Sequence, residues 1–371
     1  MVRYGDSREA PLPNLSTPGA GEGYGVGPMH DRRKREHLRI SLEEDVGFRN
    51  LTSGFERYRF VHQALPELDW EAIDLSVEFL GHSLTAPLLI SPMTGGTPQA
   101  ESINRRLAEA AQSRRIGMSL GSVRAALEDP SLAYTYQVRD VAPDIFLVAN
   151  LGAVQLNYGY GLDECRRAVD LTGADALCLH LNPLQEALQE GGNRNWAGLL
   201  RKIENICRKL EVPVLVKEVG WGISGEVAAQ LAQVGVAAID VAGAGGTTWA
   251  LVEMHRATRE MDRRLAATFA EWGIPTAQSI ELVKQAAPHV PIIASGGIYD
   301  GITAAKALAL GASLVGMARP FLQAAQVSAE AAAELVDELT QALRVVMLCL
   351  GTPDIPALQR TPHLRRVDGI P

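Results

Sequence analysis

Short apolar runs and longer helical patterns alternate along the chain from residue 87 onward. Each run is bounded by Gly, Pro, Asn or Ser, and its apolarity is continuous, which is typical of parallel strands covered on both faces. Patterns rich in Ala and Leu lie between the runs, for example over 99–113, 196–209 and 301–310. The predicted strands are 88–90, 116–118, 145–149, 176–179, 214–216, 238–241, 292–294 and 314–317.

Eight such units predict an α/β fold, a (β/α)8 TIM barrel with an N-terminal basic extension, rather than a doubly wound sheet with fewer strands. The helical pattern over 328–350 is expected to close the barrel, and the long gap from Val241 to Ile292 predicts an insertion. We therefore expect a flexible leader over 1–31, an N-terminal arm and pre-barrel segment over 32–86, the barrel over 87–350 and a C-terminal tail over 351–371.

The predicted leader and arm differ in composition. Residues 1–30 contain six Gly and four Pro with few large apolar residues, a composition that cannot offset the entropy of ordering. Residues 32–39 contain five cations and one anion. Such charge runs are usually solvated, but one beside a barrel that binds anions could also bind phosphate.

Charge and cysteine content narrow the class of protein. The 371 residues include 35 Lys and Arg against 43 Asp and Glu, giving a net charge of −8, which disfavours nucleic acid as a partner. The four cysteines show no C-x-x-C spacing and fit a reducing compartment. No apolar run has the length of a membrane span. We expect a cytoplasmic protein without a membrane partner.

Polar residues follow each predicted strand, where the active site of a TIM barrel forms. Ser295-Gly296-Gly297 follows the seventh strand and Ala318-Arg319 the eighth, the place where barrels commonly bind phosphate through backbone N–H groups. The turn over 243–247 is also rich in glycine and either contacts the same ligand or is a plain turn.

Two further segments indicate chemistry. Lys217 ends an apolar strand, so its ammonium needs an acceptor inside the barrel mouth, while Glu218 must point the other way. The segment His180-Leu181-Asn182-Pro183-Leu184-Gln185-Glu186 supplies an imidazole, two amides and a carboxylate. One carboxylate suffices for Mg²⁺ only where substrate phosphates complete its ligands, so a metal at Glu186 would imply a phosphorylated substrate.

Several short segments occur in a fixed order along the chain. They are Arg33-Lys34-x-x-His37, Ser91-Pro92-Met93-Thr94-Gly95-Gly96, Met118-Ser119-Leu120-Gly121-Ser122, Ala149-Asn150, His180 to Glu186, Lys217-Glu218-Val219-Gly220 and Ser295-Gly296-Gly297-Ile298. In this order they resemble the FMN-dependent type 2 isopentenyl diphosphate isomerases, and the resemblance covers residues 32–350. It implies a homo-oligomer, a tetramer or octamer, that interconverts isopentenyl and dimethylallyl diphosphate in isoprenoid biosynthesis. It also implies reduced FMN, Mg²⁺ and NADPH as flavin reductant.

The resemblance also implies roles for individual residues. The flavin would be bound by Met93, Thr94, Ser122, Asn150, Lys217, Thr247, Gly296, Gly297, Ala318 and Arg319. The substrate would be bound by Arg33, Lys34, His37, Arg124 and Gln185, with Glu186 as the magnesium ligand. The catalytic set would be His180, Asn182, Gln185 and Glu253, in which the proton donor and acceptor stay open among the flavin nitrogen, Gln185 and Glu253. Thr248 departs from the serine expected before Trp249.

Two alternative functions share the barrel and the phosphate site. The FMN-dependent 2-hydroxy acid oxidases and dehydrogenases resemble each other in a His-Gly-x-Arg element after the sixth strand, but the corresponding segment here, Gly243-Ala244-Gly245-Gly246-Thr247, contains neither His nor Arg. A non-catalytic flavin or phosphate sensor would need neither a magnesium ligand nor the polar set over 180–186.

Overall fold

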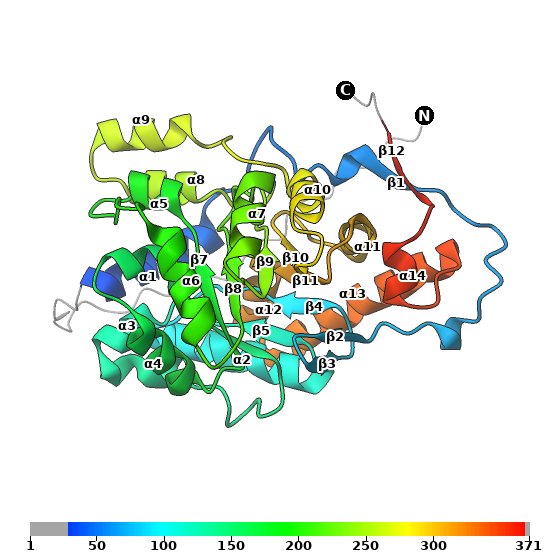
Figure 1. Ribbon diagram of the computed structural model, residues 1–371, viewed down its shortest axis with the longest axis horizontal. Helices are drawn as coiled ribbons and strands as arrows, with labels where there is room; N and C mark the ends of the chain where they lie inside the picture. The colour runs from blue at the N-terminus through cyan, green and yellow to red at the C-terminus, as the bar shows by residue number, and fades with distance from the viewer. Residues whose placement is uncertain (1–28, 368–371) are drawn as a thin grey trace, which may run out of the picture.

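The computed structural model describes residues 29–367 and contains a closed barrel of eight parallel strands (Figure 1). The last strand pairs with the first, with Val315 opposite Leu88, and so closes the barrel. The strands are β4 (Leu88–Ile90), β5 (Gly117–Ser119), β6 (Leu147–Gly152), β7 (Ala176–His180), β8 (Val214–Lys217), β9 (Ala238–Asp240), β10 (Ile292–Ser295) and β11 (Leu314–Met317). The predicted (β/α)8 TIM barrel is confirmed.

The predicted strands match these eight in order, with differences of up to three residues at their ends. The largest difference is in β6, which was expected over 145–149 and begins at Leu147. Ile145 and Phe146 are buried just before it, and the carbonyl oxygen of Phe146 accepts from the N–H of Met118 in β5, so the apolar run begins ahead of the strand itself. β6 then continues to Gly152 because Asn150, Leu151 and Gly152 pair with β7.

Helices follow the strands and cover the outside of the barrel (Figure 1). They are α2 (Pro98–Arg114), α3 (Arg124–Glu128), α4 (Leu162–Thr172), α5 (Pro183–Leu188), α6 (Leu199–Lys209), α7 (Gly225–Gln233), α10 (Thr276–Ala286), α11 (Gly301–Leu310), α12 (Arg319–Val327) and α13 (Ala329–Leu350). α13 has the bounds that its periodicity predicts because Ser328 caps its first turn and Gly351 ends it with a φ of 64°. α6 begins only at Leu199, since Gly198 before it has a φ of 68°.

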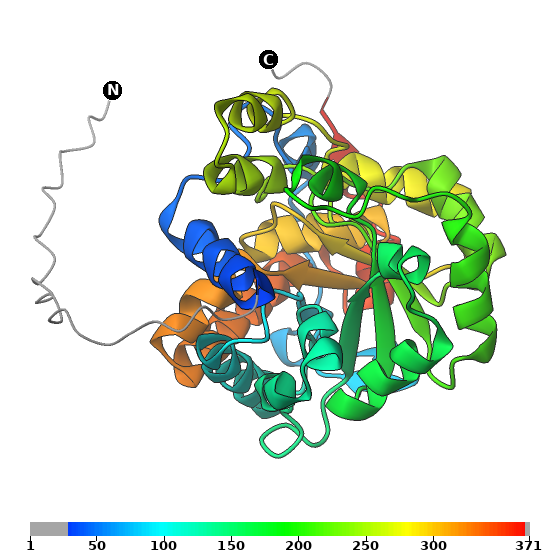
Figure 2. The same ribbon diagram turned by 90° about the vertical axis from the view of Figure 1, so that its left-hand side faces the viewer.

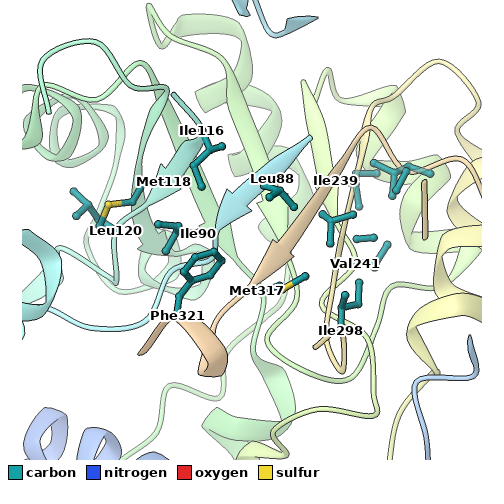
Figure 3. Close-up of a cluster of buried hydrophobic side chains, with 14 of the residues drawn as sticks. Leu88, Ile90, Ile116, Met118, Leu120, Ile239, Val241, Ile298, Met317 and Phe321 are labelled. Atoms are coloured by element: carbon teal, nitrogen blue, oxygen red, sulfur yellow. The ribbon is translucent and has the colours of Figure 1, made fainter. Parts of the chain in front are cut away.

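Apolar side chains form two layers. The outer layer fills the space between strands and helices and includes Leu88, Ile90, Met118 and Phe321 (Figure 3). The inner layer lies within the barrel and includes Phe79 and Leu84, which come from the hairpin of β2 (Val77–Phe79) and β3 (His82–Leu84). The Phe79 ring meets that of Phe146 edge to face at 5.6 Å. The hairpin therefore adds its apolar side chains to the inner layer, on which the polar cavity described below rests.

The gap between β9 and β10 contains the predicted insertion. It forms α8 (Trp249–Arg256) and α9 (Glu260–Thr268) before the barrel helix α10 begins. Figure 2 shows α8 and α9 beside the barrel mouth, next to the N-terminal helix.

The basic arm is helical. α1 (Met29–Glu43) begins within the range expected as the flexible leader, and residues 1–28 of that leader lie outside the described residues. Ile40 of α1 is buried with Val46, Leu251 and Val252, so the helix docks on α8 (Figure 2). This contact places the cations of the arm over the barrel mouth.

The remaining elements lie outside the barrel. Residues 351–367, expected as a tail, form α14 (Ile355–Gln359) and β12 (Leu364–Arg366), which pairs antiparallel with β1 (Tyr58–Phe60). Single 3-10 turns occur at Phe55–Arg57, Trp70–Ala72, Pro130–Thr135 and Ala153–Asn157. None of the helices between residues 29 and 367 combines the length and apolar content of a membrane crossing.

Candidate active site

A cavity of about 300 Å³ lies at the carboxyl ends of the barrel strands, bordered by α1. It has the size and placement of a ligand site in this fold. All but one of the predicted site residues line it: Arg33, Lys34, His37, Met93, Thr94, Ser122, Arg124, Asn150, His180, Asn182, Gln185, Glu186, Lys217, Thr247, Gly296, Gly297, Ala318 and Arg319. The exception, Glu253, lies behind this lining.

Backbone forms one end of the cavity, between β10 and β11. Gly296 has a φ of 102°, and a Cβ there would meet the carbonyl oxygen of Gly243 at 2.1 Å. A Cβ on Gly297 would meet the backbone of Gly245 at 2.6 Å. α12 begins at Arg319 beside this loop, and Ala318 before it offers no side-chain cap. Unfilled N–H groups at a helix start and a side-chain-free loop suit a phosphate.

Amides and a lysine form the floor. Asn150 Oδ1 lies 2.9 Å from Nδ1 of His180, and Nζ of Lys217 donates to the carbonyl oxygen of Glu218. The buried Ser91 Oγ, which sequence reasoning did not single out, has no hydrogen-bond partner among the described residues. A buried hydroxyl without a partner at a cavity wall is a group that a ligand can satisfy. The floor thus offers donors and acceptors to a flat polar ligand such as a flavin ring.

Burial shifts the pKa values of two ionisable groups in the floor, His180 and Asp240. It lowers the pKa of His180 to about 3, helped by the nearby Lys217, so the imidazole is neutral. Burial also raises the pKa of Asp240, whose carboxylate accepts a hydrogen bond from Ser295 Oγ at 2.6 Å. Burial thus acts against the charged forms of both His180 and Asp240, whose pKa values Lys217 also influences.

Lys217 and Glu218 point to opposite sides, as predicted from their positions on one strand. Lys217 lines the cavity, whereas Glu218 Oε2 accepts hydrogen bonds from the backbone N–H groups of the next three residues. Burial raises the pKa of Glu218 to about 7 despite these bonds. Glu218 is thus a structural residue that fixes the turn after β8.

The segment after β7 gathers a dense polar cluster at the start of α5. Asn182 Nδ2 donates to Gln185 Oε1 at 3.0 Å and to Glu186 Oε1 at 3.3 Å. Glu186 Oε2 accepts from the backbone N–H of Asn193 at 2.5 Å. The buried Asn182 Oδ1 has no partner among the described residues. An amide oxygen and a carboxylate side by side suit Mg²⁺, although no group of three His, Cys, Asp or Glu side chains in the described range could hold a metal alone.

Glu253 lies beneath this cluster, where it joins two cavity-lining residues. Its Oε1 accepts from Gln185 Nε2 at 3.1 Å and lies 3.0 Å from His37 Nε2. The His37 ring meets Trp249 edge to face at 5.1 Å. Hydrogen bonds and charges from His37 and Arg256 lower the pKa of Glu253 although its burial acts to raise it. The carboxylate therefore fixes the rotamer of the Gln185 amide.

Cations border the cavity on the α1 side. Lys34 Nζ donates to the carbonyl oxygen of Ser122 at 2.9 Å and to the hydroxyl of Tyr136, whose ring centroid lies 5.1 Å away. Burial and then the charge of Arg33 lower the pKa of Lys34 to about 7. Burial and the charge of Arg124 lower the pKa of Arg33. Burial and mutual repulsion both disfavour the charged forms of these side chains. Their grouping at one border of the cavity therefore indicates an anionic ligand.

Tyr136 is a site residue that the sequence did not suggest. It lies in a segment without a strand or barrel helix, and only its contacts show its part in holding Lys34. Its ring also lies where a Cβ of Gly95 would be, 2.0 Å from that position.

Comparison with known proteins decides between the alternative functions. Residues 30–133 and 182–366 match the model of the FMN-dependent dehydrogenase family. Curated isopentenyl-diphosphate delta-isomerases from Nostoc sp., Xanthobacter autotrophicus and Rickettsia felis are 55%, 54% and 50% identical to the chain. These alignments cover 90%, 89% and 88% of this chain and 96%, 96% and 95% of the relatives. The chain belongs to the type 2 isopentenyl diphosphate isomerases.

Membership makes the protein an isomerase and supports FMN as its cofactor. Solved structures show the fold alone at lower identity. A flavocytochrome b2 variant with pyruvate bound is 17% identical, with a TM-score of 0.65 over 90% of this chain and 85% of that one. A mandelate oxidase variant is also 17% identical, with a TM-score of 0.61 over 90% and 99%. The predicted family is confirmed, and the hydroxy acid oxidases share the barrel with it.

Proposed function

We propose that this isomerase interconverts isopentenyl and dimethylallyl diphosphate with reduced FMN and Mg²⁺. One observation supports the proposal most directly: a single cavity is lined by three kinds of group. They are the glycine cradle of Gly296 and Gly297, the amides and the carboxylate after β7, and the cations of α1. Relatives that carry the isomerase name at 50% identity or more over most of the chain support the substrate.

The cradle and the floor would hold FMN. Gly296 and Gly297 leave room for its phosphate because they carry no side chains, and Ala318 and Arg319 at the start of α12 line the same end of the cavity. Its ring would rest on the floor, where Ser91 Oγ is an unused polar group. Met93, Thr94, Ser122, Asn150, Lys217 and Thr247 would complete this site. When bound and reduced, FMN supplies a ring nitrogen that can give or take a proton.

The opposite end would hold the diphosphate. Arg33, Lys34 and Arg124 would bind its oxygens by charge-assisted hydrogen bonds, and Mg²⁺ at Glu186 would neutralise the rest of its charge. Asn182 Oδ1 fits this assignment, since a metal ion or its bound water satisfies an acceptor without a partner. The five-carbon tail is then held toward the floor, which brings its reacting carbons to a fixed place.

Proton transfer at the tail requires polar groups of fixed orientation. Gln185, held by Asn182 and Glu253, faces the cavity and is placed to hold or pass a proton at its amide. His37 and Glu253 share a hydrogen bond that can return the proton from behind that amide. The neutral His180 orients Asn150.

The direct test is to incubate purified protein with isopentenyl diphosphate, Mg²⁺, FMN and NADPH and to detect dimethylallyl diphosphate. We expect product only when the flavin is reduced, because the reduced ring supplies the nitrogen that we propose gives or takes the proton. Equal turnover with oxidised FMN would contradict the proposed role of the reduced flavin. A parallel incubation with a 2-hydroxy acid should give no oxidation, because the turn over 243–247 has neither His nor Arg.

We further propose that the protein acts in the cytoplasm as a homo-oligomer, a tetramer or octamer, with NADPH reducing its flavin. Light scattering of the purified protein measures the subunit number. Anaerobic bleaching of the flavin by NADPH tests the reductant.

A further inference from the structure

Arg256 lies outside the cavity lining but contacts carboxylates on two helices. Its Nη1 donates to Oε2 of Glu253 on the same helix α8, at 2.6 Å, and its Nε donates to Oε2 of Glu36 on α1, at 3.2 Å. Its side chain is 14% exposed and that of Glu253 2%, so this pair is shielded from water, whereas Glu36 is 30% exposed. Shielded, charge-assisted hydrogen bonds of this kind are stronger than pairs on the surface.

These bonds belong to a chain of hydrogen bonds that runs from α1 to the polar cluster at the start of α5. It runs from Glu36 through Arg256 to Glu253, from there to Gln185 Nε2 at 3.1 Å, and from Gln185 Oε1 to Asn182 Nδ2 at 3.0 Å. Asn182 then donates to the carboxylate of Glu186. The arm, the amide and the proposed metal ligand are therefore joined by consecutive hydrogen bonds.

Helix α1 has both attractive and repulsive contacts at the cavity edge. Lys34 Nζ donates to the carbonyl oxygen of Ser122, and the charges of Glu186 and Glu253 favour that of Arg33, whereas those of Arg124 and Arg256 oppose it. Apolar contacts anchor α1 at Leu38 and Ile40, in its second half, whereas Arg33 and Lys34 lie nearer its start. The Glu36 carboxylate is an attractive contact that lies between these two parts.

We propose that Arg256 is a positioning residue that fastens α1 over the cavity through Glu36 and, through Glu253, fixes the orientation of the Gln185 amide. The planar guanidinium suits this double task because two of its N–H groups point to different carboxylates at once. A lysine at this position would keep the charge opposite Glu253 but would lose the fixed fork. The kinetic part of the proposal rests on the proposed isomerase function.

The test uses full-length FMN-loaded protein with the variants Glu36→Gln, Arg256→Lys and Arg256→Ala. Arg259→Ala is the matched control, because Arg259 forms an exposed pair with Asp262 three residues away. The first measurement is kcat and KM for isopentenyl diphosphate. The second is amide hydrogen exchange over residues 33–43, without ligand and with inorganic pyrophosphate.

We expect Glu36→Gln to raise KM about fivefold, to leave kcat within about twofold and to speed exchange across α1, since its charge-assisted bond to Arg256 is weakened. Arg256→Ala should also lower kcat by about thirtyfold, because Glu253 then loses the partner of its Oε2. Arg256→Lys should restore kcat to within about threefold but keep the raised KM, a split that a merely structural arginine would not produce. Arg259→Ala should match the wild type.

The proposal is overturned if Glu36→Gln and Arg256→Lys both keep wild-type KM and wild-type exchange over α1. These two variants decide the question even if Arg256→Ala fails to fold. A wild-type protein that makes no dimethylallyl diphosphate would refute the proposed function instead. The exchange of α1 and the binding of pyrophosphate would then still decide whether Arg256 fastens the helix.

Discussion

Side-chain cations line the cavity at its α1 end, whereas glycine backbone lines it at its β10–β11 end. Arg33, Lys34 and Arg124 are long side chains whose charges repel one another, and they come from α1 and α3. Gly296 and Gly297 carry no side chains, and their backbone is closely packed against the turn after β9. The two ends therefore suit anions that are held in different ways, by side-chain charge at one end and by fixed backbone dipoles at the other.

This contrast fits the two ligands that we propose. A cofactor that stays bound through many turnovers benefits from a closely packed backbone site, whereas a substrate with a strongly charged diphosphate benefits from several cationic side chains. FMN binding at the glycine end should accordingly weaken when a side chain fills its space. Substrate binding at the cationic end should weaken when its charge is removed. Substitutions at the two ends should separate flavin binding from substrate binding.

The largest effect should come from filling the glycine end. In Gly296→Ala the new Cβ would meet the Gly243 carbonyl oxygen at 2.1 Å at a φ of 102°, so the loop must move and FMN affinity should fall at least about 100-fold. Gly159→Ala is the matched control, because Gly159 has a φ of 92° with nothing near its Cβ position. Flavin absorbance after gel filtration measures retention, with circular dichroism to check folding. If Gly296→Ala retained FMN at the wild-type level, the loop of Gly296 and Gly297 would not be part of the flavin site.

The next largest effect should be on magnesium-dependent turnover, when the polar cluster at the start of α5 loses its carboxylate. Glu186→Gln removes the one charge at the proposed metal position, so magnesium-dependent turnover should fall about 100-fold or more while the flavin spectrum stays unchanged. Glu190→Gln, an exposed change nearby, should be neutral. The measurement is turnover against Mg²⁺ concentration. An unchanged Mg²⁺ dependence in Glu186→Gln means that the metal binds elsewhere.

The contrast between the two ends also explains what the sequence could and could not reveal. Continuous apolar runs predict buried parallel strands, and residues just after each strand lie at one rim by topology alone. For this reason Lys217 was predicted in the cavity and Glu218 outside it, as the structure has them. The glycine end follows from the same rule, since it lies immediately after β10 and β11.

The cationic end depends on contacts between distant residues, which no local pattern reveals. Lys34 is held by Tyr136, which is 102 positions away, and Glu36 by Arg256, which is 220 positions away. The basic run predicted an arm, but its helix docks through Ile40 and α8, a contact set by tertiary packing. Likewise β12 pairs with β1 from the opposite end of the chain, so the C-terminal residues gave no local strand signal.

A smaller effect should follow when charge is removed from the α1 end. In the double variant Arg33→Ala with Lys34→Ala, the substrate Kd should rise by about 100-fold or more, because charge-assisted contacts contribute about 1.5 to 3 kcal/mol each. FMN affinity should stay unchanged. The control is Arg35→Ala with Arg39→Ala, which removes the same charge from exposed positions on the same helix. Isothermal titration with substrate at matched ionic strength compares the two double variants. If their binding curves coincide, the cations of α1 do not bind the substrate and α1 is a solvated arm.

The smallest effect should be a pH dependence at the same end. Burial lowers the pKa of Lys34 to about 7, so in the ligand-free protein its ammonium is present below that pH and is lost above it. Binding of an anion favours the protonated lysine, and substrate affinity should therefore fall as pH rises through 7.

Lys34→Arg isolates this effect, because a guanidinium keeps its charge throughout the range and the ionisation of the diphosphate cancels in the comparison. Between pH 6 and 8 the affinity of the wild type relative to Lys34→Arg should fall by about threefold to tenfold. FMN affinity should show no such change, since backbone N–H groups at the glycine end do not titrate. A wild-type to variant ratio that stays constant with pH would mean that Lys34 remains charged, and the cationic end would then resemble the glycine end in holding its anion without titration.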